Sequence, residues 1–145
     1  MSPKEILIVD DSRAILKAFS MKLEANGYKI QTAENGGDAL KLVRRRRPVL
    51  ILLDINFPAE VDFDGGVAWD GFLILDWLRR MDESHKIPVI VITGDNHAKH
   101  EERARAAGAV NFMRKPVKPD ELLIAVRQAL GEATGSAPPA AATQA

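Results

Sequence analysis

The chain contains no cysteine among its 145 residues. This absence excludes disulfide bonds, thiolate zinc sites and thiol catalysis. The apolar runs are far too short to cross a bilayer, and the first residues lack the layout of a signal peptide. Basic and acidic residues balance at 20 each, so the overall charge does not indicate binding to nucleic acid or to an anionic membrane. We therefore expect a cytoplasmic protein with no nucleic-acid or membrane partner.

Short apolar runs separated by helical periodicities are present instead. The expected strands are 6–9, 28–33, 49–54, 87–92 and 110–114. The expected helices are 12–27, 38–47, one beginning near 70–71, 96–107 and 119–131. This fivefold alternation predicts an α/β fold whose parallel sheet is covered by helices on both faces. We expect residues 1–131 to form one domain and residues 132–145, rich in Ala and Pro, to form a disordered tail.

Polar residues with related chemistry follow several of these strands. They are Asp10, Asp11, Asp54, Thr93 and Lys115. The carboxyl ends of parallel strands share one edge of a sheet, where open α/β folds place their ligand sites. Three carboxylates so close together need raised pKa values or a hard cation, and oxygen ligands suit Mg²⁺. A lysine and a threonine beside them suit the oxygens of a phosphoryl group, and a carboxylate beside a cation can attack phosphorus.

With these residues in place, the chain resembles a receiver domain of the two-component response regulators from about residue 4 to residue 131. The motifs that carry the resemblance are Val9-Asp10-Asp11-Ser12, Leu53-Asp54-Ile55-Asn56-Phe57-Pro58, Asp70-Gly71, Val91-Ile92-Thr93-Gly94 and Lys115-Pro116. The resemblance implies a flavodoxin-like, doubly wound sheet of five parallel strands in the order 2-1-3-4-5. It also implies a cis peptide bond before Pro116 and, at Gly94, open access for a phosphodonor.

The resemblance also implies a role for each site residue. Asp54 would accept a phosphoryl group from a histidine kinase's phosphohistidine, and Thr93 and Lys115 would hold the phosphoryl oxygens. Phe112 would be the aromatic switch residue that moves with Thr93. The implied ligands of Mg²⁺ are Asp10, Asp11, Asp54 and the backbone carbonyl of Asn56. The fourth helix, fifth strand and fifth helix would then form the surface that reports phosphorylation to a partner.

The connection from Pro58 to Asp70-Gly71 departs from the family, because eleven residues, 59–69, stand where about two are usual. This insertion is expected to be irregular, and it carries Glu60, Asp62 and Asp64. One interpretation is a solvated loop whose acidity serves solubility. The other is a lid or partner-recognition loop that controls access of the phosphodonor or loss of the phosphoryl group.

Other signals have simpler interpretations. The arginines at 44–47 are typical of a solvated helix end, where cations also favour the helix dipole. His97 and His100 have no evident third ligand and are expected to be surface histidines. Trp69 and Trp77 are expected to pack, and Trp77 is considered as a residue that faces the sheet. The predicted helix 96–107 has mostly alanine as its apolar content, so we expect it to be weakly anchored and able to shift.

Three classes of function compete. The first is a stand-alone, non-enzymatic receiver, which at most catalyses its own aspartyl phosphorylation and dephosphorylation. Its partners would be a sensor histidine kinase or histidine phosphotransfer protein and a downstream protein target, and it would be a monomer or a phosphorylation-dependent dimer. The second is a phosphatase or phosphotransferase with an aspartate nucleophile, resembling the haloacid dehalogenases; that group needs a second aspartate where Asn56 stands. The third is a scaffold that works without phosphorylation, which the intact residue set disfavours.

Overall fold

The computed structural model describes residues 4–55, 60–61, 68–69, 71–80, 86–94 and 98–132. Its main sheet has five parallel strands in the spatial order β2-β1-β3-β6-β7. The strands are β1 (Glu5–Val9), β2 (Lys29–Ala33), β3 (Leu50–Leu53), β6 (Val89–Thr93) and β7 (Asn111–Arg114). Because β4 and β5 lie outside this sheet, the order corresponds to the predicted 2-1-3-4-5 and confirms the flavodoxin-like fold.

The three central strands contain runs of apolar residues that are buried on both faces of the sheet. Alternate side chains enter opposite halves of the core. Ile6, Ile8, Leu50, Leu52, Ile90 and Ile92 pack on one face, and Leu7, Val9, Ile51, Leu53, Val89 and Val91 pack on the other. An unbroken apolar run is the pattern that a strand covered on both faces requires. The first polar residue after each run therefore falls at the edge of the core.

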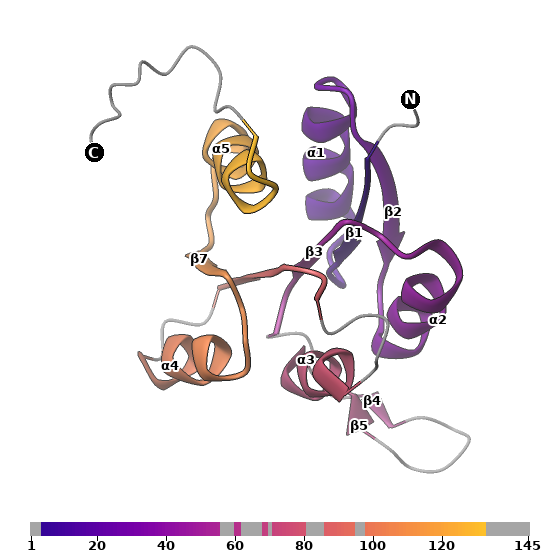
Figure 1. Cartoon of the computed structure of the whole chain (residues 1–145), viewed down its shortest axis with the longest axis vertical. Helices are drawn as coiled ribbons and strands as arrows, with labels where there is room; N and C mark the ends of the chain where they lie inside the picture. The colour runs from indigo at the N-terminus through magenta and orange to yellow at the C-terminus, as the bar shows by residue number, and fades with distance from the viewer. Residues whose placement is uncertain are drawn as a thin grey trace.

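The five helices of the described residues form the two outer layers (Figure 1). Residues of α1 (Arg13–Glu24) and α5 (Pro119–Ala129) join the core cluster on one face. Residues of α2 (Gly36–Arg46), α3 (Gly71–Arg80) and α4 (Ala98–Ala106) join the cluster on the other. The prediction of helices on both faces is therefore confirmed. Among the described helices, none is long and apolar enough to span a membrane.

Side-chain caps explain where the first two helices begin. The hydroxyl of Ser12 accepts a hydrogen bond from the backbone N–H of Ile15 (3.3 Å) and caps α1. The side chain of Asn35 accepts one from the N–H of Asp38 (2.8 Å) and caps α2. Because of this second cap, α2 begins at Gly36. The expected start at Asp38 was wrong by two residues, since the two glycines after Asn35 suggested a turn.

The insertion contains a short antiparallel pair that the sequence did not predict. Strands β4 (Glu60–Val61) and β5 (Ala68–Trp69) pair with each other and form a separate two-stranded sheet. The expectation of a wholly irregular passage was therefore wrong. Strand β5 ends at Trp69, shortly before α3 begins at Gly71 (Figure 1). Residues 56–59, 62–67 and 70 lie outside the described part of the chain, so the predictions for Asp62 and Asp64 are not addressed.

Trp77 lies on the outer side of α3. Its side chain is 38% exposed, and the guanidinium of Arg44, from α2, lies 5.8 Å from its ring centroid. The inward orientation that we considered for this residue was wrong. Trp77 instead packs against the basic end of the neighbouring helix, which is consistent with a role in packing.

Candidate functional site

Asp10 and Asp54 lie side by side where two adjacent strands end. Asp10 follows β1, and its backbone N–H donates to the carbonyl of Ala33 at the end of β2 (3.0 Å). Asp54 follows β3, and its N–H donates to the carbonyl of Val9 (2.9 Å). These bonds continue the ladder of the sheet by one residue, so each aspartate has a fixed backbone. Their side chains are only 3% and 5% exposed.

Lys115 connects the two carboxylates. Its Nζ donates to Oδ2 of Asp10 (2.8 Å) and to Oδ2 of Asp54 (2.9 Å). Burial of the ammonium group acts to lower the pKa of Lys115, but the hydrogen bonds to Asp10 and Asp54 outweigh it, and the pKa is raised above its usual value. The lysine is therefore a fixed positive charge in contact with both buried aspartates.

Ser12 has a second function that the sequence analysis missed. Its backbone N–H donates to Oδ1 of Asp10 (2.9 Å), while its side chain caps α1. Asp10 is consequently held through both carboxylate oxygens, by Ser12 on one side and Lys115 on the other. An aspartate two residues before a helix cap is a recognisable turn pattern, so the signal was present in the sequence.

The acidic group at this edge has the composition of a metal site. Asp10, Asp11 and Asp54 each offer one carboxylate oxygen, and these oxygens lie within 4.8 Å of one another. Two of the residues are buried and Asp11 is exposed, so the group opens toward solvent on one side. Hard oxygen donors with space for water suit a divalent cation such as Mg²⁺. The donor set therefore fits the metal that the sequence predicts.

Thr93 and Gly94 form the next part of the edge, at the end of β6. Thr93 is fully buried, and its carbonyl accepts a hydrogen bond from the N–H of Lys115 (2.9 Å). A methyl group at Gly94 would meet no atom within 4 Å, so the space outside this residue is open. The predicted cis peptide bond between Lys115 and Pro116 is present.

Of the other two predicted site residues, Phe112 and Asn56, Phe112 lies in the described part of the chain. Phe112 of β7 is half-buried and packs against the core cluster that contains residues of α2, α3 and α4. Asn56, whose backbone carbonyl was expected to bind metal, lies outside the described residues, as does His97. His100 instead packs edge-to-face on Phe72, with ring centroids 5.5 Å apart.

The site thus combines a buried carboxylate at the end of a central strand, two further carboxylates and a lysine in contact with two of the three. Such a group can bind a cation and present an oxygen nucleophile to an electrophile that approaches from solvent. An anionic electrophile would gain from Lys115, because the lysine can transfer its hydrogen bonds from the carboxylates to the incoming oxygens.

Comparisons with known proteins agree with this arrangement. The family model "Response regulator receiver domain" matches residues 6–127. The polar-differentiation response regulator DivK of Brucella anthropi is 36% identical over 131 residues, which span 90% of this chain and 99% of DivK. The structure of the chemotaxis protein CheY4 of Vibrio cholerae matches with a TM-score of 0.77 at 26% identity, covering 88% of this chain and 98% of CheY4. A CheY-like receiver domain protein of Methanospirillum hungatei matches with a TM-score of 0.77 at 30% identity, covering 90% and 95% of the two chains.

Proposed function

Because this chain belongs to the response regulator receiver domain family, we propose that Asp54 is the residue that accepts the phosphoryl group. The chain is a phosphoacceptor signalling module rather than an ordinary enzyme. The observation that carries the assignment to Asp54 is its environment. Its carboxylate is 5% exposed and has the Lys115 ammonium 2.9 Å from Oδ2. Asp10 shares these two features, but Asp54 follows β3, the middle strand of the five, whereas Asp10 follows β1.

In the proposed reaction, a carboxylate oxygen of Asp54 attacks the phosphorus atom of a phosphohistidine. The oxygen–phosphorus bond forms as the phosphorus–nitrogen bond breaks, and the imidazole leaves with the electron pair and takes a proton from solvent. Lys115 transfers a hydrogen bond from Oδ2 of Asp54 to a phosphoryl oxygen, and the hydroxyl of Thr93 holds another. Both groups thus stabilise charge that is brought to the site by the phosphodonor.

The proposed cofactor is Mg²⁺, held by Asp10, Asp11 and Asp54 together with the backbone carbonyl of Asn56. When bound, the metal supplies charge neutralisation between the carboxylates and the phosphoryl oxygens. Ser12 contributes by fixing one oxygen of Asp10 through its backbone N–H. The other oxygen of Asp10 is bonded to Lys115, so this lysine and a metal would share the same carboxylate.

The phosphorylated domain would signal through Thr93 and Phe112. When Thr93 turns toward the phosphoryl group, Phe112 moves into the space it leaves, and α4, β7 and α5 change their packing. Phosphorylation would bias an equilibrium between two existing states rather than create a new fold. The register of β6 and β7 supports this coupling. Phe112 pairs with Val91, and Arg114 pairs with Thr93. Because residues two apart in a strand lie on the same face, Phe112 and Thr93 lie on the same face of the sheet, on neighbouring strands.

As a receiver domain, the chain interacts with histidine kinases and downstream targets. We propose that its phosphodonor is a sensor histidine kinase or a histidine phosphotransfer protein, and that residues 1–131 constitute the functional domain. Family membership disfavours the haloacid-dehalogenase alternative, as does Asn56 in place of its second aspartate. The buried, hydrogen-bonded aspartates disfavour a scaffold that works without phosphorylation, since burying unused carboxylates is costly. A cytoplasmic location stays a prediction.

The test is incubation of the protein with Mg²⁺ and acetyl phosphate, followed by intact-mass measurement. We expect one phosphoryl adduct on the natural sequence, none on Asp54→Ala, and none when Mg²⁺ is chelated. Glu34→Ala, which removes a half-exposed carboxylate outside the site, is the control and should retain the adduct. An adduct that persists in Asp54→Ala, or its absence from the natural sequence, would overturn the assignment.

A further inference from the structure

Strand β2 forms an edge of the main sheet, with β1 as its sole neighbour among the described strands. The N–H of Lys29 donates to Lys4 on the β1 side, and the carbonyl of Ala33 accepts from Asp10. In a parallel ladder, alternate residues direct both backbone groups to the same side. Ile30 and Thr32 therefore direct their N–H and C=O groups away from β1. This edge presents a backbone to which a further strand can bind.

A groove lies beside this edge, between β2 and α2. We call it the β2–α2 groove; it is about 250 Å³ in volume and is lined by Thr32, Asp38, Lys41, Leu42 and Arg45. Lys41 and Arg45 are four residues apart, so they lie on the same side of α2 and repel each other. Asp38 accepts a hydrogen bond from the side chain of Asn35 (3.2 Å) and is engaged in the helix cap. A carboxylate between the two cations would remove their repulsion.

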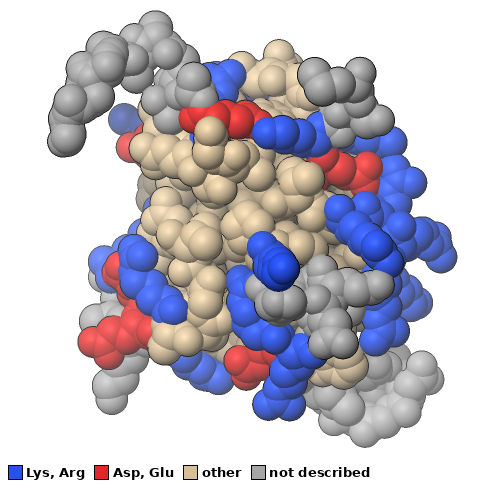
Figure 2. All heavy atoms as spheres, in the orientation of Figure 1, with Lys and Arg blue, Asp and Glu red and all other residues tan. Residues whose placement is uncertain are grey.

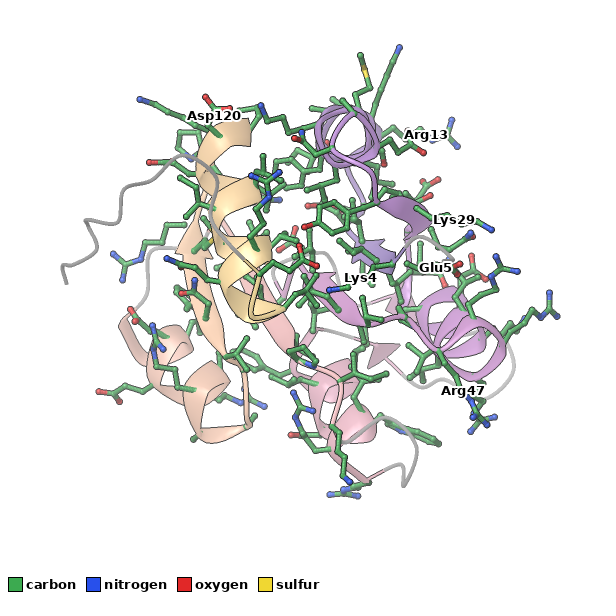
Figure 3. All side chains as sticks on the ribbon, turned by 45° about the horizontal axis from the view of Figure 1, so that its top comes forward. Lys4, Glu5, Arg13, Lys29, Arg47 and Asp120 are labelled. Carbon is green, nitrogen blue, oxygen red and sulfur yellow. The ribbon has the colours of Figure 1, made fainter. Side chains whose placement is uncertain are left out.

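The surroundings of the groove are also basic. A second hollow of about 310 Å³ lies on the α1 side of Thr32 and is lined by Arg13, Lys17 and Glu34, among others. Glu34 is paired with Arg13 (3.5 Å), so Lys17 supplies the net positive charge of this hollow. Figure 2 shows many lysine and arginine side chains along this flank, with acidic side chains among them, and further basic side chains on other sides of the molecule. Arg13, Lys29 and Arg47 project outward on the same flank, from α1, β2 and the end of α2 (Figure 3). The chain as a whole is neutral, so this charge is local.

We propose that the β2 edge and the β2–α2 groove form a docking site for an extended acidic segment of a partner protein. The segment adds to the sheet through the backbone groups of Ile30 and Thr32 and places a carboxylate between Lys41 and Arg45. A peptide fits better than nucleic acid, because outward N–H and C=O groups match another peptide backbone. The residues that line the two hollows also include no aromatic side chain for base stacking.

The first experiment measures binding of a fluorescein-labelled, end-blocked peptide of alternating Glu and Val, about six residues long to match a strand. We expect saturable binding by fluorescence anisotropy. The double variant Lys41→Glu/Arg45→Glu should weaken it about tenfold or more, because the carboxylates would then face like charges. The matched control Arg80→Glu/Lys86→Glu makes the same charge change at two exposed residues outside the groove and should leave the affinity unchanged.

The second experiment follows amide hydrogen exchange by NMR with the same peptide bound. The amides of Ile30 and Thr32 should exchange more slowly, whereas those of Gln31 and Ala33, which already face β1, should change little. Unchanged exchange at Ile30 and Thr32, equal loss of affinity in both double variants, or equally tight binding of a DNA duplex would overturn the proposal. The phosphoryl adduct on Asp54 is measured separately, so failure here leaves the proposed function untouched.

Discussion

Helices α2 and α4 lie on the same face of the sheet but are held to it by different interactions. The buried side of α2 carries Ala39, Leu40 and Val43. In α4 the side chains from His100 to Ala106 are described, and of these only that of Ala104 is buried. Hydrophobic stabilisation scales with the apolar area removed from water, so it contributes far more to the attachment of α2.

Contacts with α3 compensate for part of this difference at α4. The guanidinium of Arg103 lies 4.0 Å from the ring centroid of Phe72, and His100 contacts the same ring edge-to-face. At the other end of the helix, Arg79 donates hydrogen bonds to the carbonyls of Ala107 (3.3 Å) and Gly108 (3.2 Å). The strength of these hydrogen bonds and ring contacts depends on the direction and distance between the groups, whereas apolar burial is not directional.

The comparison indicates how one layer can contain a fixed helix and a movable one. Separating α2 from the sheet exposes several apolar side chains, which amounts to unfolding. Moving α4 breaks a few polar and aromatic contacts and exposes little apolar surface. Elements with few buried apolar contacts are the ones that open or shift at low cost. This difference is consistent with the proposed signalling role of α4.

The largest expected effect comes from Leu40→Ala in α2. Removing most of a buried leucine should lower the free energy of unfolding by about 2–5 kcal/mol, as measured by urea denaturation. The matched change in α4 is Ala104→Gly, which removes its buried methyl group and should cost about 1–2 kcal/mol. Equal losses in the two variants would show that α4 is anchored as firmly as α2, and the comparison would fail.

The sequence locates both helices, but it predicts the attachment of α2 better than that of α4, for the same physical reason. Leu40 and Val43 recur at helical spacing, and an apolar stripe both forms the helix and marks its buried side. The attachment of α4 depends on Phe72 and Arg79, which come from another helix and leave no periodic signal near residues 98–106. The two-residue strands β4 and β5 were missed because strands of that length are too short to show alternation.

In the site, too, the residues with a local sequence signal could be predicted, and the contacts between distant elements could not. Asp10, Asp54 and Thr93 could be placed because each ends an apolar run, and runs buried on both faces identify the carboxyl edge of the sheet. The contacts of Lys115 with both aspartates could not be predicted. They depend on how the chain turns after β7, which the spacing of residues does not determine.

The next prediction tests the contacts that hold α4. Replacing Arg79 with Met retains much of the buried stem but removes its hydrogen bonds to the carbonyls of Ile87, Ala107 and Gly108. Leaving such groups without partners should cost about 1–3 kcal/mol. Amide hydrogen exchange should become faster in α4 and β7, with little change in α1 and β2. If exchange rises uniformly across the domain, Arg79 supports global stability rather than α4.

Gly108 offers a second way to disturb the same contact. Its φ of +100° is unfavourable for other residues, and a Cβ there would lie 2.7 Å from Nε of Arg79. Gly108→Ala should therefore accelerate exchange in the same segments as Arg79→Met. Combining the two changes should add less than the sum of the single effects, because the clash with Nε of Arg79 is absent once Arg79 is replaced, whereas the cost of the positive φ remains.

The smallest expected effect concerns an ion pair that gives α2 a second anchor. Arg46 donates to both carboxylate oxygens of Glu5 on β1 (2.8 and 3.1 Å). These hydrogen bonds hold the pKa of Glu5 below its ordinary value of 4.5, although burial acts to raise it. A lowered pKa means that the carboxylate stabilises the fold above pH 4.5, and that this contribution is lost as the pH falls through the pKa of the folded state.

Glu5→Gln should therefore flatten the acid side of a plot of unfolding midpoint against pH. Arg46→Gln should flatten it less, because Lys29 lies 3.9 Å from Glu5 and still lowers the pKa of its carboxyl group. The double variant should match Glu5→Gln. If the acid slope is unchanged in Glu5→Gln, the pair does not anchor α2, and the difference between the two helices depends on apolar burial alone.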